Sequence, residues 1–164
     1  MDIGLLVLRL ALGTTLAAHG VQKLFGWFGG PGLQGTAKGM ESLGFVPGAR
    51  AALFAGLAEA GGGFLLAVGL FTPAASAAFL GVMLVAVVSV HLSKGFFAQN
   101  GGYEYNLVLA LGALSLAFTG PGSLSLDGAF GLTLYGPSWG VGAVLAGLVG
   151  GALQLAMRRE PATT

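Results

Sequence analysis

The chain has 164 residues, of which 55% are hydrophobic and only 8% charged, and its mean hydropathy is +0.86. Soluble domains carry about a quarter charged residues, so the composition excludes that class and predicts an all-α integral membrane protein in a lipid bilayer. A net charge of +1, with no basic run beyond Arg158-Arg159, excludes nucleic acid as a partner. The absence of cysteine excludes thiol chemistry and cysteine-ligated metals, so any redox chemistry must belong to a bound cofactor or a partner, and we expect no metal site.

Five apolar segments predict transmembrane helices, at residues 3–25, 50–71, 73–92, 105–119 and 137–157. A helix needs about 20 residues to cross the hydrocarbon core, so the fourth segment is short for a span. In the first long loop, residues 33–44 place apolar side chains at helical spacing between polar ones. This pattern predicts an amphipathic helix at the membrane interface, and the alternative is a flexible glycine-rich connector.

Basic residues predict the orientation of the five spans. With five crossings, the N-terminus lies on one membrane face and the C-terminal tail on the other. The second face receives most of the basic side chains, namely Lys23, Lys38, Arg50, Lys94, Arg158 and Arg159. Because basic residues are enriched in cytoplasmic loops, we expect the N-terminus outside and the C-terminus in the cytoplasm.

Ionisable side chains in or beside the apolar segments are the best guide to function, because a charge at the bilayer centre costs roughly 2.5 to 3.5 kcal/mol on insertion scales. Six fall near one membrane face: His19, Lys23, Glu59, His91, Lys94 and Glu104. His19 and Lys23 are four residues apart and share a helix face. Gln22 adjoins them, and Arg9 lies farther up roughly the same side. Glu59 is the expected counter-charge, since an unpaired carboxylate is costly at that depth.

These residues predict a polar intramembrane site near the cytoplasmic face. A quinone-like head group fits best, because its carbonyl oxygens need hydrogen-bond donors and a carboxylate can relay protons. The candidate catalytic residues are Glu59, His19, Lys23 and His91. The candidate cofactor-binding residues are Arg9, His19, Gln22, Lys23, Glu59, His91 and Glu104. Haem held by two histidines is a weaker alternative, since His91 lies nearer the surface than His19.

Other interpretations of the same residues stay open. The polar cluster is also compatible with a network that only fixes helix register. A polar stripe from Arg9 to Lys23 is compatible with a path for protons or a small solute. Glycines within the spans, such as Gly147 and Gly151, let helices approach closely. These glycines favour packing of helices within the chain over a homo-oligomer. The main alternative function is a non-enzymatic scaffold that binds another protein.

Several motifs, taken in order, resemble the DoxX family of small bacterial and archaeal membrane proteins. They are Arg9, then H-G-x-Q-K-L-F-G from His19, A-E ending at Glu59, V-H-x-x-x-G-F-F around His91, and G-Y-E-Y around Glu104. Each motif is loose alone, but the combination is specific and covers residues 7–128. Arg9, His19, Lys23, Glu59, His91 and Glu104 occupy the polar positions of these motifs.

The resemblance implies a four-helix membrane core at residues 1–128, and an extension at residues 129–164 with a loop, the fifth helix and a short polar tail. It also implies a multi-pass protein of the cytoplasmic (inner) membrane. Members of the family include a subunit of thiosulfate:quinone oxidoreductase and proteins linked to oxidative or thiol stress. The resemblance therefore implies a redox role beside quinone or a redox partner protein, as a subunit or accessory of a membrane system.

Overall fold

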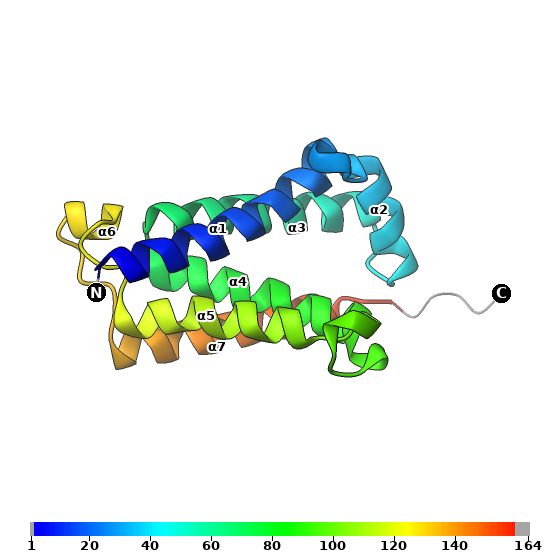
Figure 1. The fold of residues 1–164 in the computed structure, drawn as a ribbon. Helices are drawn as coiled ribbons and strands as arrows, with labels where there is room; N and C mark the ends of the chain where they lie inside the picture. Colours follow the sequence, from blue (N-terminus) through cyan, green and yellow to red (C-terminus); the bar gives the residue numbers. More distant parts are fainter. Residues whose placement is uncertain (1, 160–164) are drawn as a thin grey trace.

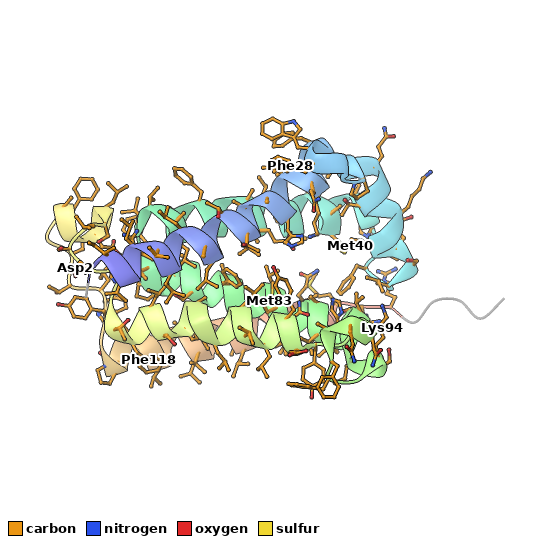
Figure 2. The ribbon with its side chains drawn as sticks, in the orientation of Figure 1. Asp2, Phe28, Met40, Met83, Lys94 and Phe118 are labelled. Carbon is orange, nitrogen blue, oxygen red and sulfur yellow. The ribbon has the colours of Figure 1, made fainter. Side chains whose placement is uncertain are left out.

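Five long helices lie side by side in the part of the chain that the computed structural model describes, residues 2–159 (Figure 1). Every regular element in that range is helical, which confirms the predicted all-α class. The long helices are α1 (Asp2–Phe25), α3 (Gly48–Val68), α4 (Thr72–Ala86), α5 (Glu104–Thr119) and α7 (Pro137–Ala156). Figure 2 shows Asp2 at one end of the bundle and Lys94 at the other, and we call these the Asp2 end and the Lys94 end.

Shorter helices occupy the connections. At the Lys94 end, the 3₁₀ turn η1 (Trp27–Gly29) leads into α2 (Gly32–Ser42), which lies where the sequence predicts an interfacial helix. The short helix α6 (Leu126–Ala129) lies at the Asp2 end. The remaining turns sit around the end of α4 and before α5, namely the π-helical turn η2 (Val87–His91) and the 3₁₀ turns η3 (Leu92–Lys94) and η4 (Ala98–Asn100).

Four helical stretches in the described residues are long and apolar enough to cross a membrane: α1, α3, Thr72–Lys94 and α7. They support the predicted integral membrane class. α5 is apolar but has 16 residues, which extend about 24 Å, less than the roughly 30 Å of a hydrocarbon core. With the stretch Thr72–Lys94 taken as one span, the long helices begin and end within three residues of the bounds expected from the sequence, although α4 itself gives way to the turn η2 after Ala86.

A tight corner makes α3 and α4 antiparallel. Gly69 has a φ of 66°, a left-handed conformation that glycine adopts without strain. The N–H groups of Gly69 and Leu70 close the last turn of α3 by donating to the carbonyls of Leu66 (3.1 Å) and Leu65 (2.9 Å). Pro73 stands in the first turn of α4, where its missing N–H breaks no helical hydrogen bond.

Glycines let α1 pack closely on α3, the most extensive helix contact in the bundle. A Cβ atom on Gly13 would lie 2.5 Å from the backbone nitrogen of Ala67 and the carbonyl oxygen of Gly63. A Cβ atom on Gly20 would overlap the backbone of Ala60. Since no side chain fits at these positions, glycine permits the approach and fixes one antiparallel register between the two helices.

Asp127 holds the 120–136 loop against the start of α4. Its buried carboxylate accepts hydrogen bonds from the N–H groups of Phe71 (2.8 Å) and Thr72 (3.0 Å), and from the Thr72 hydroxyl (2.7 Å). In return, the Asp127 N–H donates to the carbonyl of Gly69 (2.8 Å). The free N–H groups and the dipole at a helix start favour an anion, so Asp127 caps α4 from a distant part of the chain.

Arg9 ties α1 to the same corner. Its side chain is 1% exposed and donates to the carbonyls of Ala67, in the last turn of α3 (2.8 Å), and Leu124, in the loop (2.5 Å). A cation is favoured at a helix C-terminus, as the Asp127 carboxylate is at the start of α4. Arg9 and Asp127 therefore place opposite charges at the two helix ends that meet in this corner.

The G-x-x-x-G pair of α7 packs within the chain. A Cβ atom on Gly147 would lie 2.7 Å from the carbonyl oxygen of Ala77, and one on Gly151 would lie 2.8 Å from the side chain of Leu84. Both glycines thus face α4, as the sequence favours. A homo-oligomer through other glycine-rich faces stays a prediction.

We expect Gly63→Ala to lower the free energy of unfolding by about 1 to 3 kcal/mol, because its methyl group would overlap the backbone of Ala17 on α1. The matched control is Gly61→Ala, two residues away in the same helix, where a Cβ atom meets nothing within 4 Å. That control should be neutral or stabilising, since alanine is the better helix former. Unfolding in mixed micelles, followed by circular dichroism, compares the two, and equal effects would contradict the glycine-set register.

We expect Asp127→Ala to destabilise the protein by about 3 to 5 kcal/mol, because it uncaps α4 and leaves the buried Arg9 without its counter-charge. The control is Asp2→Ala, whose exposed carboxylate binds Ser123 near the same end and should cost much less stability. The same unfolding assay applies. A loss for Asp127→Ala no larger than that of the control would show that the cap is not needed.

Candidate functional site

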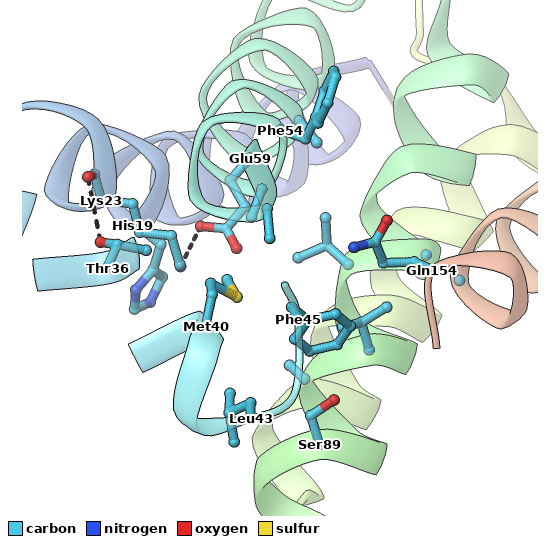
Figure 3. Close-up of a pocket in the computed structure, with 18 of the residues that line it drawn as sticks. His19, Lys23, Thr36, Met40, Leu43, Phe45, Phe54, Glu59, Ser89 and Gln154 are labelled. Atoms are coloured by element: carbon cyan, nitrogen blue, oxygen red, sulfur yellow. Dashed lines mark hydrogen bonds and ion pairs between the residues drawn. The ribbon is translucent and has the colours of Figure 1, made fainter. Parts of the chain in front are cut away.

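A cavity of about 850 Å³ lies inside the bundle toward the Lys94 end. One side of it is formed by α1, α2 and α3, and the other by α4, η2 and α7 (Figure 3). The sequence predicts a polar site lined by His19, Gln22, Lys23, Glu59 and His91, and the structure brings all five to this cavity. Whether they bind a cofactor stays a prediction.

An ion pair between Lys23 on α1 and Glu59 on α3 is the main charged feature of the cavity. The Lys23 Nζ atom donates to Glu59 Oε2 at 2.5 Å, and the two side chains are 26% and 7% exposed. The α1–α3 register produces this contact, because Gly20 meets Ala60 one turn away. Taking a carboxylate out of water is costly unless an opposite charge lies beside it, and Lys23 supplies that charge.

His19 adds a titratable ring next to the ion pair. It lies one turn before Lys23 on the same face of α1, and Figure 3 shows its imidazole beside Lys23 and Thr36 at the cavity. Gln22 also lines the cavity, but its amide donates a long hydrogen bond of 3.4 Å to the carbonyl of Phe28. The α1 wall thus offers an ammonium group, an imidazole and an amide.

Helix α2 covers the cavity at the Lys94 end of the bundle. Thr36 anchors it, since its hydroxyl lies 2.8 Å from the carbonyl of Gly32 and 3.3 Å from that of Lys23. Met40 and Phe45 contribute apolar side chains to the lining (Figure 3). The predicted interfacial helix is therefore part of the cavity wall, which its amphipathic pattern alone does not reveal.

The residues after α7 hold this cover in place. Arg158 donates from Nε to the carbonyl of Leu43 (2.9 Å), and its guanidinium lies 5.5 Å from the centre of the Phe45 ring. The N–H of Arg159 donates to the carbonyl of Gly44 (2.8 Å). The end of α7 is thereby attached to the connection between α2 and α3.

The π-helical turn η2 brings Ser89 and His91 to the cavity. Such turns inside α-helices often occur at functional sites, because the extra residue redirects the side chains. The Ser89 hydroxyl is buried and has no hydrogen-bond partner among the described residues. His91 Nδ1 lies 2.6 Å from the carbonyl of Gly101, so Nδ1 carries the proton and Nε2 stays available as an acceptor in the neutral ring.

Gln154 on α7 is a cavity residue that the sequence analysis does not identify. Its amide points into the cavity from the side opposite Glu59 (Figure 3). It is uncharged and lies near the basic end of its helix, so a search for ionisable groups passes over it. Its spacing is the available signal, because Gly147, Gly151 and Gln154 fall at i, i+4 and i+7 on the face that packs inward.

Three residues of the predicted cluster lie away from the cavity. Arg9 is at the Asp2 end, about 21 Å along α1 from Lys23, and the buried apolar side chains of Leu12 and Leu16 lie between them. Glu104 begins α5, and its Oε2 accepts from the N–H of Ala98 (3.0 Å). Lys94 closes η3 and does not line the cavity. The structure therefore does not bring these three to the Lys23–Glu59 pair.

No group of three or more potential metal ligands occurs within residues 2–159. The cavity instead presents single polar groups of different kinds on an apolar background. Lys23 and Gln154 donate hydrogen bonds, Glu59 accepts them, and His19 can do either. This set suits a small polar group with acceptor atoms, bound at membrane depth.

Comparison with known proteins gives one family. The model of the DoxX family matches residues 4–92. The chain is 32% identical over 126 residues to "Putative oxidoreductase CatD" of Bacillus subtilis (strain 168), an alignment that covers 77% of this chain and 86% of that protein. It is 31% identical over 126 residues to "Inner membrane protein YqjF" of Escherichia coli (strain K12), covering 77% of this chain and 91% of that protein. No solved structure matches.

The family model starts in α1 and ends in η3, so it contains Lys23, Glu59 and the π-helical turn with His91. Gln154, which completes the cavity from α7, lies outside the matched residues. With more than half of the chain inside the family model and two relatives aligned over most of their length, the protein belongs to the DoxX family of membrane proteins.

Proposed function

We propose that the protein works as a subunit or accessory of a membrane redox system and binds a small redox molecule with a quinone-like head group in the cavity. The observation that carries this proposal is the Lys23–Glu59 ion pair, buried in a cavity of about 850 Å³ within the spanning helices. Ionisable groups at membrane depth usually serve binding or proton transfer. The cavity volume falls within the roughly 300 to 1,000 Å³ of small-molecule sites.

The lining residues fit such a head group. Quinone carbonyl oxygens accept hydrogen bonds, and Lys23, His19 and Gln154 can donate them from two sides of the cavity. A bound quinone would supply the electron-accepting chemistry. Glu59 and His19 would hold or pass the protons that accompany electrons, because carboxylate and imidazole groups are common proton donors and acceptors in enzymes.

The electrons must come from elsewhere. The chain contains no cysteine, so no thiol of its own can donate them. We therefore place the donor in a redox partner protein or a second substrate. The name of the relative from Bacillus subtilis, which calls it an oxidoreductase, supports this proposal.

The structure favours this site over a proton or solute path. Such a path would use the polar stripe from Arg9 to Lys23, but Leu12 and Leu16 are 6% and 0% exposed between those residues. A scaffold without chemistry remains the main rival. The scaffold hypothesis predicts a folded protein without a bound cofactor, so measuring the cofactor content distinguishes it from the redox proposal.

We also propose that the protein lies in the inner membrane with the Lys94 end in the cytoplasm. The name of the Escherichia coli relative supports the membrane, and the basic residues at the Lys94 end support the orientation. We expect a reporter fused after Thr164 to read cytoplasmic and one fused before Asp2 to read external. If both reporters lie on the same side, the number of spans is even, and α5 with its 16 residues is the first to question.

We expect Glu59→Gln to lose the bound ligand while the protein still inserts and folds, since glutamine keeps the shape but not the charge that pairs with Lys23. The measurement combines an absorption spectrum of protein purified in mild detergent with mass spectrometry of its organic extract. Wild type should carry about one quinone-like molecule per chain.

The matched control is Glu41→Gln on α2, whose carboxylate accepts from the N–H of Gly48 (3.2 Å) away from the cavity lining. It should keep the ligand. A wild-type preparation with no organic cofactor would contradict the redox proposal and favour the scaffold. Equal ligand content in wild type and Glu59→Gln would show that the ion pair is not part of the binding site.

A further inference from the structure

The cavity continues past its polar groups as an apolar groove. Both α3 and α7 pack on α4 but have little contact with each other, so α4 forms the floor between them. Along α4 the lining runs from Ala77 to His91, which corresponds to about 21 Å along the helix axis. The polar lining residues Ser89 and His91 lie in η2 at one end of this length, and Ala77 and Ala78 lie at the other end.

Small residues keep the groove open. On α7, Ala146, Gly150 and Gln154 fall at i, i+4 and i+8, so they form one stripe along the cavity, with the amide nearest the Lys94 end. On α3, Ala55 and Glu59 face the cavity in the same way. The α7 wall therefore continues from its amide toward the bilayer centre with small residues, whereas on α3 Ala55 lies on the Lys94 side of Glu59.

The groove opens sideways toward lipid. Three lining residues on the two walls α3 and α7 are exposed although these helices span the membrane: Phe54 on α3, which is 68% exposed, and Ala146 and Gly150 on α7. Figure 3 shows Phe54 and Gln154 on opposite walls. Exposed residues on a spanning helix face the hydrocarbon region, so a molecule dissolved in the bilayer can reach the cavity without passing through water.

Resting on the proposed function, we propose that the ligand is an amphiphile whose head group lies between the Lys23–Glu59 pair and Gln154 and whose apolar chain lies in the α3–α7 groove. The site is then loaded from the bilayer, and water-soluble molecules are not its substrates. Helix α7 has a specific part in this site, because it supplies the amide for the head group and the small residues beside the chain.

The shape of the groove would determine where the ligand's apolar chain binds, because both the groove and the surrounding lipid are apolar. Moving an apolar chain from lipid into a groove gains little hydrophobic free energy, so contact and available space decide. Filling the groove should therefore hinder a ligand with a chain and spare the same head group without one. This difference separates the groove from the head-group site.

The test uses a benzoquinone with a decyl chain and the same benzoquinone without a chain, added to protein in phospholipid nanodiscs. Binding is measured as the ligand-dependent rise in unfolding temperature. We expect Gly150→Leu to weaken binding of the decyl compound about tenfold or more and to leave the chainless compound unchanged. A Cβ atom at Gly150 meets nothing within 4 Å, so the leucine can fold into place.

Gly142→Leu is the matched control. Gly142 continues the stripe of Ala146 and Gly150 by two turns from Gly150, a Cβ atom there also meets nothing within 4 Å, and it does not line the cavity. It should bind both compounds like wild type. If Gly150→Leu does not fold, Ala146→Leu fills the same groove and should give the same result.

The outcomes separate the two proposals. If neither compound stabilises the wild type, the proposed function fails, and this inference fails with it. If both compounds bind but Gly150→Leu and Ala146→Leu weaken neither, or weaken both equally, the groove does not hold the chain and this inference alone is overturned. Selective weakening of the decyl compound by the groove variants, and not by Gly142→Leu, supports it.

Discussion

The antiparallel register of α1 on α3 is the constraint on which the other features depend. Glycines at the contact leave space for one alignment, in which Gly13 meets Gly63 and Gly20 meets Ala60. A shift by one helical turn would place side chains against backbone. The same alignment puts Lys23 beside Glu59 and Arg9 at the last turn of α3, so one apolar contact positions the polar groups at both ends.

The two ends use charge differently. Toward the Asp2 end, two carbonyl groups accept from the Arg9 guanidinium, Asp127 balances its charge, and Arg9 fixes a corner of the fold. Toward the Lys94 end, the ion pair borders a cavity, and the buried Ser89 hydroxyl in the same lining has no hydrogen-bond partner among the described residues. A buried charge enclosed by protein groups is structural, whereas one that borders a cavity has capacity for a ligand.

Hydropathy and depth along each helix could predict most of the fold and part of the site. Counting residues from the membrane face brought His19, Lys23 and Glu59 to one level, because rise per residue is nearly constant. Arg9 was grouped with these residues because it lies on roughly the same side of the helix. A shared side does not show which part of the neighbouring helix a residue meets, and Arg9 meets the opposite end of α3. The same count also missed Gln154, because this residue is uncharged, and its spacing from Gly147 and Gly151 points to the cavity only once the inward face of α7 is known.

The attachment of Arg158 and Arg159 to the connection after α2 has a consequence for biogenesis. Membrane helices leave the ribosome in chain order, so α1, α2 and α3 emerge long before α7. Until α7 arrives, the groove lacks one wall and α2 is not yet attached to the C-terminal residues, but Lys23 and Glu59 are both already present. The ion pair therefore also protects the unfinished protein, by keeping a carboxylate tolerable in the bilayer while the rest is still being made.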